Sequence, residues 1–121
     1  MDYLDTGALT SLIDDLVQRT GDRSISWAPH ASQFVFMTKG KRFVYTIASI
    51  DEDDYSPFLF RIWKDEPSAP DNEPAPEGVL QEARTRPNSG MNNYLLRLYT
   101  TVKRVTLSID DVASEILTDF D

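Results

Sequence analysis

The longest unbroken run of acids, Asp51 to Asp54, separates two apolar runs and offers carboxylates for metal binding or acid–base catalysis. A calcium loop of the EF-hand type needs acids at positions 1, 3 and 5, glycine at position 6 and glutamate at position 12. Counted from Asp51, positions 5, 6 and 12 are Tyr55, Ser56 and Ile62. Adjacent acids also repel one another, which suits a hydrated turn. We therefore predict a solvated turn between two strands and no metal site.

The residue types that support nucleophilic or metal chemistry are scarce. His30 is the single histidine, and the chain has no cysteine. One imidazole without thiolates cannot form the usual zinc site of three or four nitrogen and sulfur ligands. The five glycines never cluster, so neither a nucleotide-binding glycine loop nor a strained serine turn is present. We predict a non-enzymatic protein with no catalytic residue and no cofactor.

The charge balance argues against nucleic acid as a partner. The net charge is −8, whereas nucleic-acid affinity depends on cations that contact phosphates. Lys39, Lys41 and Arg42 precede Phe43 and Tyr45, a basic and aromatic pattern that also occurs on platforms for single strands. The acidic balance favours a solvated hairpin tip instead. The last 14 residues carry five acids and no base, which suits either a solvated surface or a face for a basic partner.

No apolar run approaches the roughly 20 residues that span a bilayer. The first residues lack the basic segment and apolar core of a classical signal peptide. These features predict a cytoplasmic protein without membrane contact.

The elements that position these side chains follow from the apolar periodicity. Residues 8–20 place five apolar residues on one helical face. The period then changes to two in residues 33–38, 41–50 and 57–64, with 25–27 as a possible further strand at the edge. The pattern predicts an α+β fold with an antiparallel meander sheet of three to four strands, an N-terminal helix, and two C-terminal helices packed on one face.

The second half of the chain is predicted with more irregular structure. Residues 65–92 are rich in proline and turn residues, and indicate either a mobile linker or a functional loop, with about two helical turns at 77–84. Residues 94–105 form an apolar helical stripe. A last helix begins at Ser108, with Asp111 completing a capping box and Leu107 and Val112 forming a hydrophobic staple. Its stripe continues through Val112, Ile116 and Phe120. We predict a single domain over residues 1–121.

Strand alternation assigns the sheet residues to two faces. One face forms the core, and its residues are Phe43, Tyr45, Ile47, Phe58, Phe60 and Ile62. The other face carries Arg42, Val44, Thr46, Leu59, Arg61 and Trp63, together with Val35 and Met37. An unused sheet face is normally polar, whereas apolar residues with tryptophan and arginine are typical of interfaces. Either a partner or another part of the chain covers this face.

These features favour a small acidic protein-interaction module of the regulator, adaptor or inhibitor type. Its expected partner is a protein that contacts Val44, Leu59, Arg61 and Trp63, and a homodimer through a strand edge or this sheet face is also open. The alternative is a small-molecule-binding domain with a pocket between the sheet and the long loop. In that case Arg84, Arg86 and Arg97 would neutralise an anionic ligand. No sequence motif assigns the chain to a family.

Overall fold

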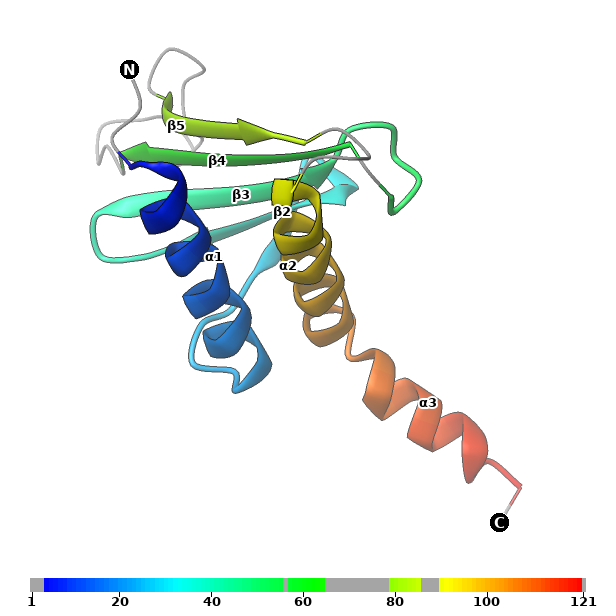
Figure 1. Cartoon of the computed structure of the whole chain (residues 1–121). Coiled ribbons are helices and arrows are strands. Elements are labelled where there is room, and N and C mark those ends of the chain that lie inside the picture. The colour runs from blue at the N-terminus through cyan, green and yellow to red at the C-terminus, as the bar shows by residue number, and fades with distance from the viewer. Residues whose placement is uncertain (1–3, 56, 65–78, 86–89, 121) are drawn as a thin grey trace.

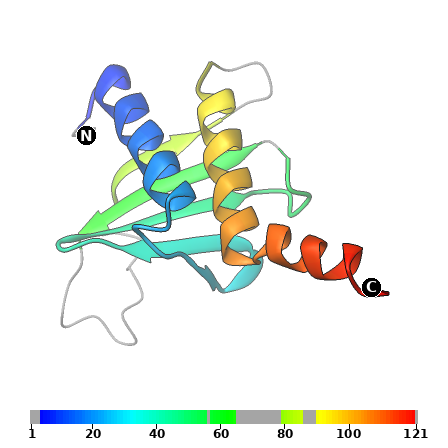
Figure 2. The ribbon, with the colours of Figure 1, turned by 90° about the horizontal axis from the view of Figure 1, so that it is seen from below.

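The computed structural model describes residues 4–55, 57–64, 79–85 and 90–120. The chain forms α1 (Thr6–Gly21), β1 (Ala28–His30), β2 (Ser32–Lys39), β3 (Phe43–Ser49), β4 (Phe58–Lys64), β5 (Val79–Arg84), α2 (Gly90–Thr106) and α3 (Ile109–Leu117). The strands are antiparallel neighbours in chain order, and α1 and α2 lie side by side on one face of the sheet (Figures 1 and 2). The predicted α+β class is confirmed. Among the described residues, no helix has the length and apolar character needed to cross a membrane.

Helix α1 follows its sequence pattern. Asp5 caps its start by accepting a hydrogen bond from the backbone amide of Ala8 at 2.7 Å. At its last turn, Thr20 donates to the carbonyl of Leu16 and accepts a 2.9 Å bond from the indole nitrogen of Trp27. The buried stripe of the helix is Leu9, Ile13, Leu16 and Val17. The first helix is therefore held at both ends and along its apolar face.

The sheet has five strands rather than the three to four that we predicted. The edge strand β1 begins at Ala28, directly after the predicted segment 25–27, and includes Pro29 opposite Phe36. Proline is tolerated there because an edge strand has one side without a partner. The helical turns predicted at 77–84 are wrong, because Val79–Arg84 form β5 against the free edge of β4. The rest of the predicted loop lies mainly outside the described residues.

The core lies between the sheet and the two helices. It confirms the predicted inner face for Ile47, Phe58, Phe60 and Ile62, while Tyr45 is partly buried against the core and Phe43 is partly exposed. The face of α2 that packs on these residues consists of Leu95, Leu98, Tyr99 and Val102. Among the described residues, no helix covers the opposite face of the sheet (Figure 1).

The last helix forms as predicted, but its predicted cap and packing do not. Ser108 has φ 52°, in the left-handed region, and its side chain makes no capping hydrogen bond to α3. A serine cap normally requires an extended backbone, so the capping box cannot form in this conformation. Leu107 and Val112, the predicted staple, are both about half exposed. As a result α3 turns away from the sheet and projects from the body of the molecule (Figures 1 and 2).

Candidate interaction surfaces

Helix α3 exposes an apolar stripe. Val112 and Ile116 lie at the i, i+4 spacing that places side chains on one helical face, and Phe120 lies in the turn that follows the end of α3 at Leu117. Together with Leu107 and Leu117 they are among the exposed large hydrophobic residues of the molecule, with exposed fractions of 47 to 99%. Isolated apolar residues are common on protein surfaces, whereas a continuous apolar stripe marks a contact surface. We call these five residues the α3 stripe, although Leu107 lies just before the helix and Phe120 just after it.

A groove lies where the start of α1 meets the β2–β3 hairpin and the adjoining ends of β4 and β5. Its volume is about 790 Å³. The described residues that line this α1 groove are Leu4, Ala8, Leu12, Lys41, Arg42, Phe43, Tyr45, Ile62, Lys64, Leu80 and Gln81. The amide of Leu4 donates a 3.1 Å hydrogen bond to the side chain of Gln81, which ties the start of the chain to β5 at the groove.

The lining of the α1 groove is apolar with a basic rim. Tyr45 and Ile62 come from the core face of the sheet, and Leu12 comes from the flank of α1. Lys41 and Lys64 are exposed, as is Arg42 beside them. Within the described residues none of these three cations forms an ion pair. A quarter of the chain's 12 basic residues therefore gathers around one apolar groove of a strongly acidic protein.

The residues predicted as partner anchors share the helix-free sheet face. Val44 lies opposite Trp63, and Leu59 lies two positions before Arg61 on the same strand. Leu59, Arg61 and Trp63 line a smaller groove of about 270 Å³, together with His30, Val35, Thr46 and Ala48. All four predicted anchors therefore share one sheet face, and three of them line one groove together with the single histidine.

Burial limits what these anchors offer to a partner. Val44 and Trp63 are only 2% and 7% exposed, whereas Leu59 and Arg61 are half-buried. Arg61 makes a 3.1 Å ion pair with Glu82, and its guanidinium lies 5.8 Å from the centre of the Trp63 ring. A partner on this face would therefore contact mainly Leu59 and the ion pair of Arg61 with Glu82.

The arginines predicted to bind an anionic ligand do not converge. Arg84 lies opposite Leu59 in the sheet and so belongs to the helix-free face. Arg97 is exposed on α2, which packs on the other face, and it forms an ion pair with the Asp14 carboxylate at 4.0 Å. Arg86 lies outside the described residues. The cations that do surround a groove are those of the β2–β3 hairpin and the end of β4.

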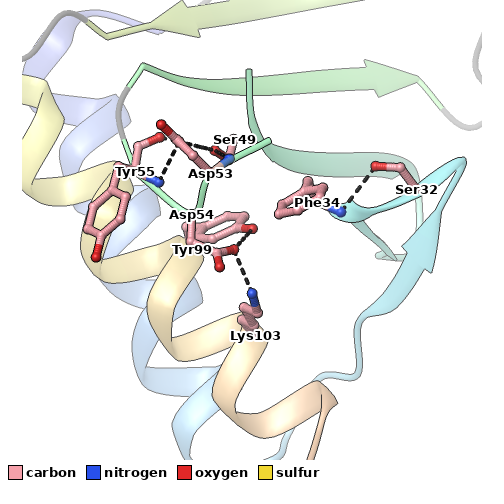
Figure 3. A network of polar contacts seen from close by, with 8 residues as sticks. All are labelled: Ser32, Phe34, Ser49, Asp53, Asp54, Tyr55, Tyr99 and Lys103. Carbon is pink, nitrogen blue, oxygen red and sulfur yellow. Dashed lines mark hydrogen bonds and ion pairs between the residues drawn. The ribbon is translucent and has the colours of Figure 1, made fainter. Parts of the chain in front are cut away.

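The acidic run Asp51–Asp54 lies in the connection between β3 and β4, as predicted, but it is more than a hydrated turn (Figure 3). Asp54 accepts a 2.7 Å hydrogen bond from the Tyr99 hydroxyl and a 2.5 Å bond from the Lys103 ammonium. The amide of Tyr55 donates to the Asp53 carboxylate at 3.0 Å. The turn is thus fixed to α2. Within the part of the chain that the structure describes, no group of three histidine or acidic residues is arranged to hold a metal ion.

This contact shifts two pKa values. The hydrogen bonds from Lys103 and then Tyr99 lower the pKa of Asp54 below its ordinary 3.8, because they stabilise the carboxylate. Burial, followed by the hydrogen bond to Asp54, raises the pKa of Tyr99 above its ordinary 10.0. The Lys103 ammonium also lies 5.7 Å from the centre of the Phe34 ring. Nothing in the local sequence indicated that Asp54 would meet a residue 45 positions later.

Comparison of the chain with protein-family models, curated proteins and solved structures found no match.

Proposed function

We propose that the protein is a non-enzymatic protein-interaction module and that α3 is its contact element. The observation that supports this proposal is the exposed α3 stripe on a helix that projects from the body. Such a stripe is the binding face in complexes where an amphipathic helix lies in an apolar groove of its partner.

The exposed side chains of the α3 stripe are large enough for their burial to stabilise a complex. Burying one large apolar side chain stabilises a complex by roughly 1.5–3 kcal/mol. Ile116, Leu117 and Phe120 are each at least 66% exposed, so docking all three would contribute on the order of 5 kcal/mol. A helix of nine residues is also marginal in water without tertiary contacts. Docking would therefore stabilise both the complex and the helix.

The charges beside the stripe indicate the sign of the partner surface. Glu115 and Asp119 are exposed, and the last 14 residues contain five acids and no base. A basic surface attracts this helix, and the attraction weakens as salt screens the charges. We propose a partner with an apolar groove and a basic rim.

The test compares proteins captured by the wild-type chain and by variants of α3. The stripe variant carries Ile116→Gln and Phe120→Gln, which remove apolar surface but retain good helix formers. The matched control carries Ala113→Gln and Ser114→Gln, two exposed positions of the same helix outside the stripe. We expect a protein partner to be retained by the wild type and the control and lost with the stripe variant. Equal retention by all three would exclude α3 as the contact element.

The helix-free sheet face is the second part of the proposal, because it combines Leu59 with the paired Arg61 beside a groove. Leu59→Asp tests it at a half-buried position, with circular dichroism to confirm that the variant folds. If a partner uses this face, Leu59→Asp weakens its capture while the α3 variants do not. Unchanged capture with Leu59→Asp would remove this face from the proposal.

The volume and chemistry of the α1 groove favour a second candidate function, the binding of a small anionic ligand with an apolar body. Ligand pockets typically measure roughly 300–1,000 Å³ and combine an apolar lining with a few charged groups. The α1 groove, at about 790 Å³ with Lys41, Arg42 and Lys64 at its rim, meets this description. A thermal-shift screen with fatty acids and aromatic carboxylates tests it. A bound ligand raises the unfolding midpoint with concentration, and Lys41→Glu/Arg42→Glu should abolish that rise.

A further inference from the structure

The α3 stripe and the α1 groove are complementary to each other. We propose that α3 of one chain docks in the α1 groove of a second copy of this chain. This inference rests on the proposed function, in which α3 is the contact element, and adds the identity of the partner.

The α1 groove and the α3 stripe are both apolar. The groove presents the partly buried Leu12 and Tyr45, with the partly exposed Phe43 at its margin and the buried Ile62 at its base. The helix presents Ile116, Leu117 and Phe120 to solvent. Docking of the helix would remove apolar atoms of both surfaces from water, and a groove of about 790 Å³ is large enough to receive side chains of this size.

The α1 groove and the α3 stripe are also flanked by charges of opposite sign. The rim of the groove carries Lys41, Arg42 and Lys64, and the docking helix carries exposed Glu115 and Asp119. Two copies with a net charge of −8 each repel one another as whole molecules. Opposite charges at the contact would offset this repulsion locally and select one orientation.

In its own chain α3 lies away from the α1 groove (Figures 1 and 2). The groove lies at the start of α1, whereas α3 leaves the opposite end of the helix layer in both views (Figures 1 and 2). The 16 residues of α1 measure about 24 Å along the helix, and the nine residues of α3 about 14 Å. The apolar stripe therefore needs a groove from another molecule, and a second copy supplies one.

The experiment is sedimentation velocity with two complementary variants of the full chain. The groove variant carries Lys41→Glu and Arg42→Glu and keeps its helix intact. The stripe variant, Ile116→Gln with Phe120→Gln, keeps its groove intact. We expect the wild type to self-associate and each variant alone to sediment as a monomer. An equimolar mixture should associate again, because the helix of the first variant can enter the groove of the second.

Controls separate this contact from general effects of charge and folding. Arg84→Glu with Arg97→Glu makes the same change in net charge away from the groove, and should self-associate like the wild type. Lys64→Glu is a second groove variant if Lys41→Glu/Arg42→Glu does not fold, as judged by circular dichroism. Added salt should weaken the wild-type assembly more strongly than it weakens the mixture, which lacks one of the two sets of rim charges.

A monomeric wild type would overturn the inference, as would an assembly that survives in the stripe variant or a mixture that remains monomeric. A monomeric wild type that still captures a different protein through Ile116 and Phe120 would leave the proposed function standing and refute only the second-copy partner. A wild type that neither self-associates nor captures another protein would refute the proposed function as well as the second-copy partner.

Discussion

Fixing the acidic turn to α2 should stabilise the fold by an amount that depends on pH. Tyr99→Phe removes the hydroxyl that donates to Asp54 and leaves the ring, which is 1% exposed and packs on Phe36 and Phe58. A hydrogen bond to a charged group contributes roughly 1.5–3 kcal/mol, and less where solvent screens the charge. The Asp54 side chain is 42% exposed, which favours the lower end of that range.

We therefore expect Tyr99→Phe to lower the free energy of unfolding by about 1.5 kcal/mol. Asp54→Ala also loses the contact with Lys103, and should lower it by about 2 kcal/mol. The two changes remove one shared hydrogen bond, so the double variant should be less destabilised than their sum by about 1 kcal/mol. Urea unfolding followed by tryptophan fluorescence measures all three values.

The pH dependence gives the sign of the effect. The folded-state pKa of Asp54 lies below the 3.8 of the unfolded chain, so the stabilisation is present above pH 3.8. It is lost as the pH falls through the lower folded-state value. The difference between wild type and Asp54→Asn should therefore shrink over that acidic window. Equal stability of Tyr99→Phe and the wild type at neutral pH, together with no coupling to Asp54, would refute the reasoning.

Three further predictions concern buried groups. Thr20→Val leaves the indole nitrogen of Trp27 without its partner and should cost about 2 kcal/mol in urea unfolding, whereas an unchanged midpoint would show that this bond contributes nothing. Trp63→Ala should destabilise the fold by about 3 kcal/mol and Leu59→Ala by less than about 1 kcal/mol, because the first is buried; equal costs would contradict that assignment. Above pH 10 the free energy of unfolding of the wild type should fall more steeply than that of Tyr99→Phe, because the pKa of Tyr99 is higher in the folded chain than in the unfolded chain and phenylalanine does not titrate. Parallel alkaline unfolding curves would exclude this.

Local periodicity predicted the elements whose residues face one common core. The stripe of α1, including Ile13 and Leu16, and the alternation of Phe58, Phe60 and Ile62 were read from the sequence because each element buries a single face. The grouping of Leu59 with Arg61 and Trp63 followed from the same alternation. Spacing alone therefore predicted which residues form the core face of the sheet and that Leu59, Arg61 and Trp63 lie together on the other face.

Contacts between distant segments could not be predicted in this way. Residues 79–84 have a composition compatible with helical turns, and pairing with the edge of β4 determined their extended conformation. The left-handed backbone of Ser108 overrode a sequence that matches a capping box. The α1 groove combines residues from α1, β3, β4 and β5, and no single segment indicates it. The stripe of α3 was visible in the sequence, but its exposure was not.

Hydrogen–deuterium exchange of the wild-type chain over a concentration series tests most directly whether α3 is covered by a second copy. At low concentration the amides of Ile109–Leu117 should exchange quickly, because a nine-residue helix without tertiary contacts is marginal in water. As the concentration rises, protection should appear together in α3 and in the groove segments at the start of α1 and at Lys41–Tyr45. Protection of α3 that never changes with concentration, or that rises without any change at the groove, would contradict docking of α3 in the α1 groove.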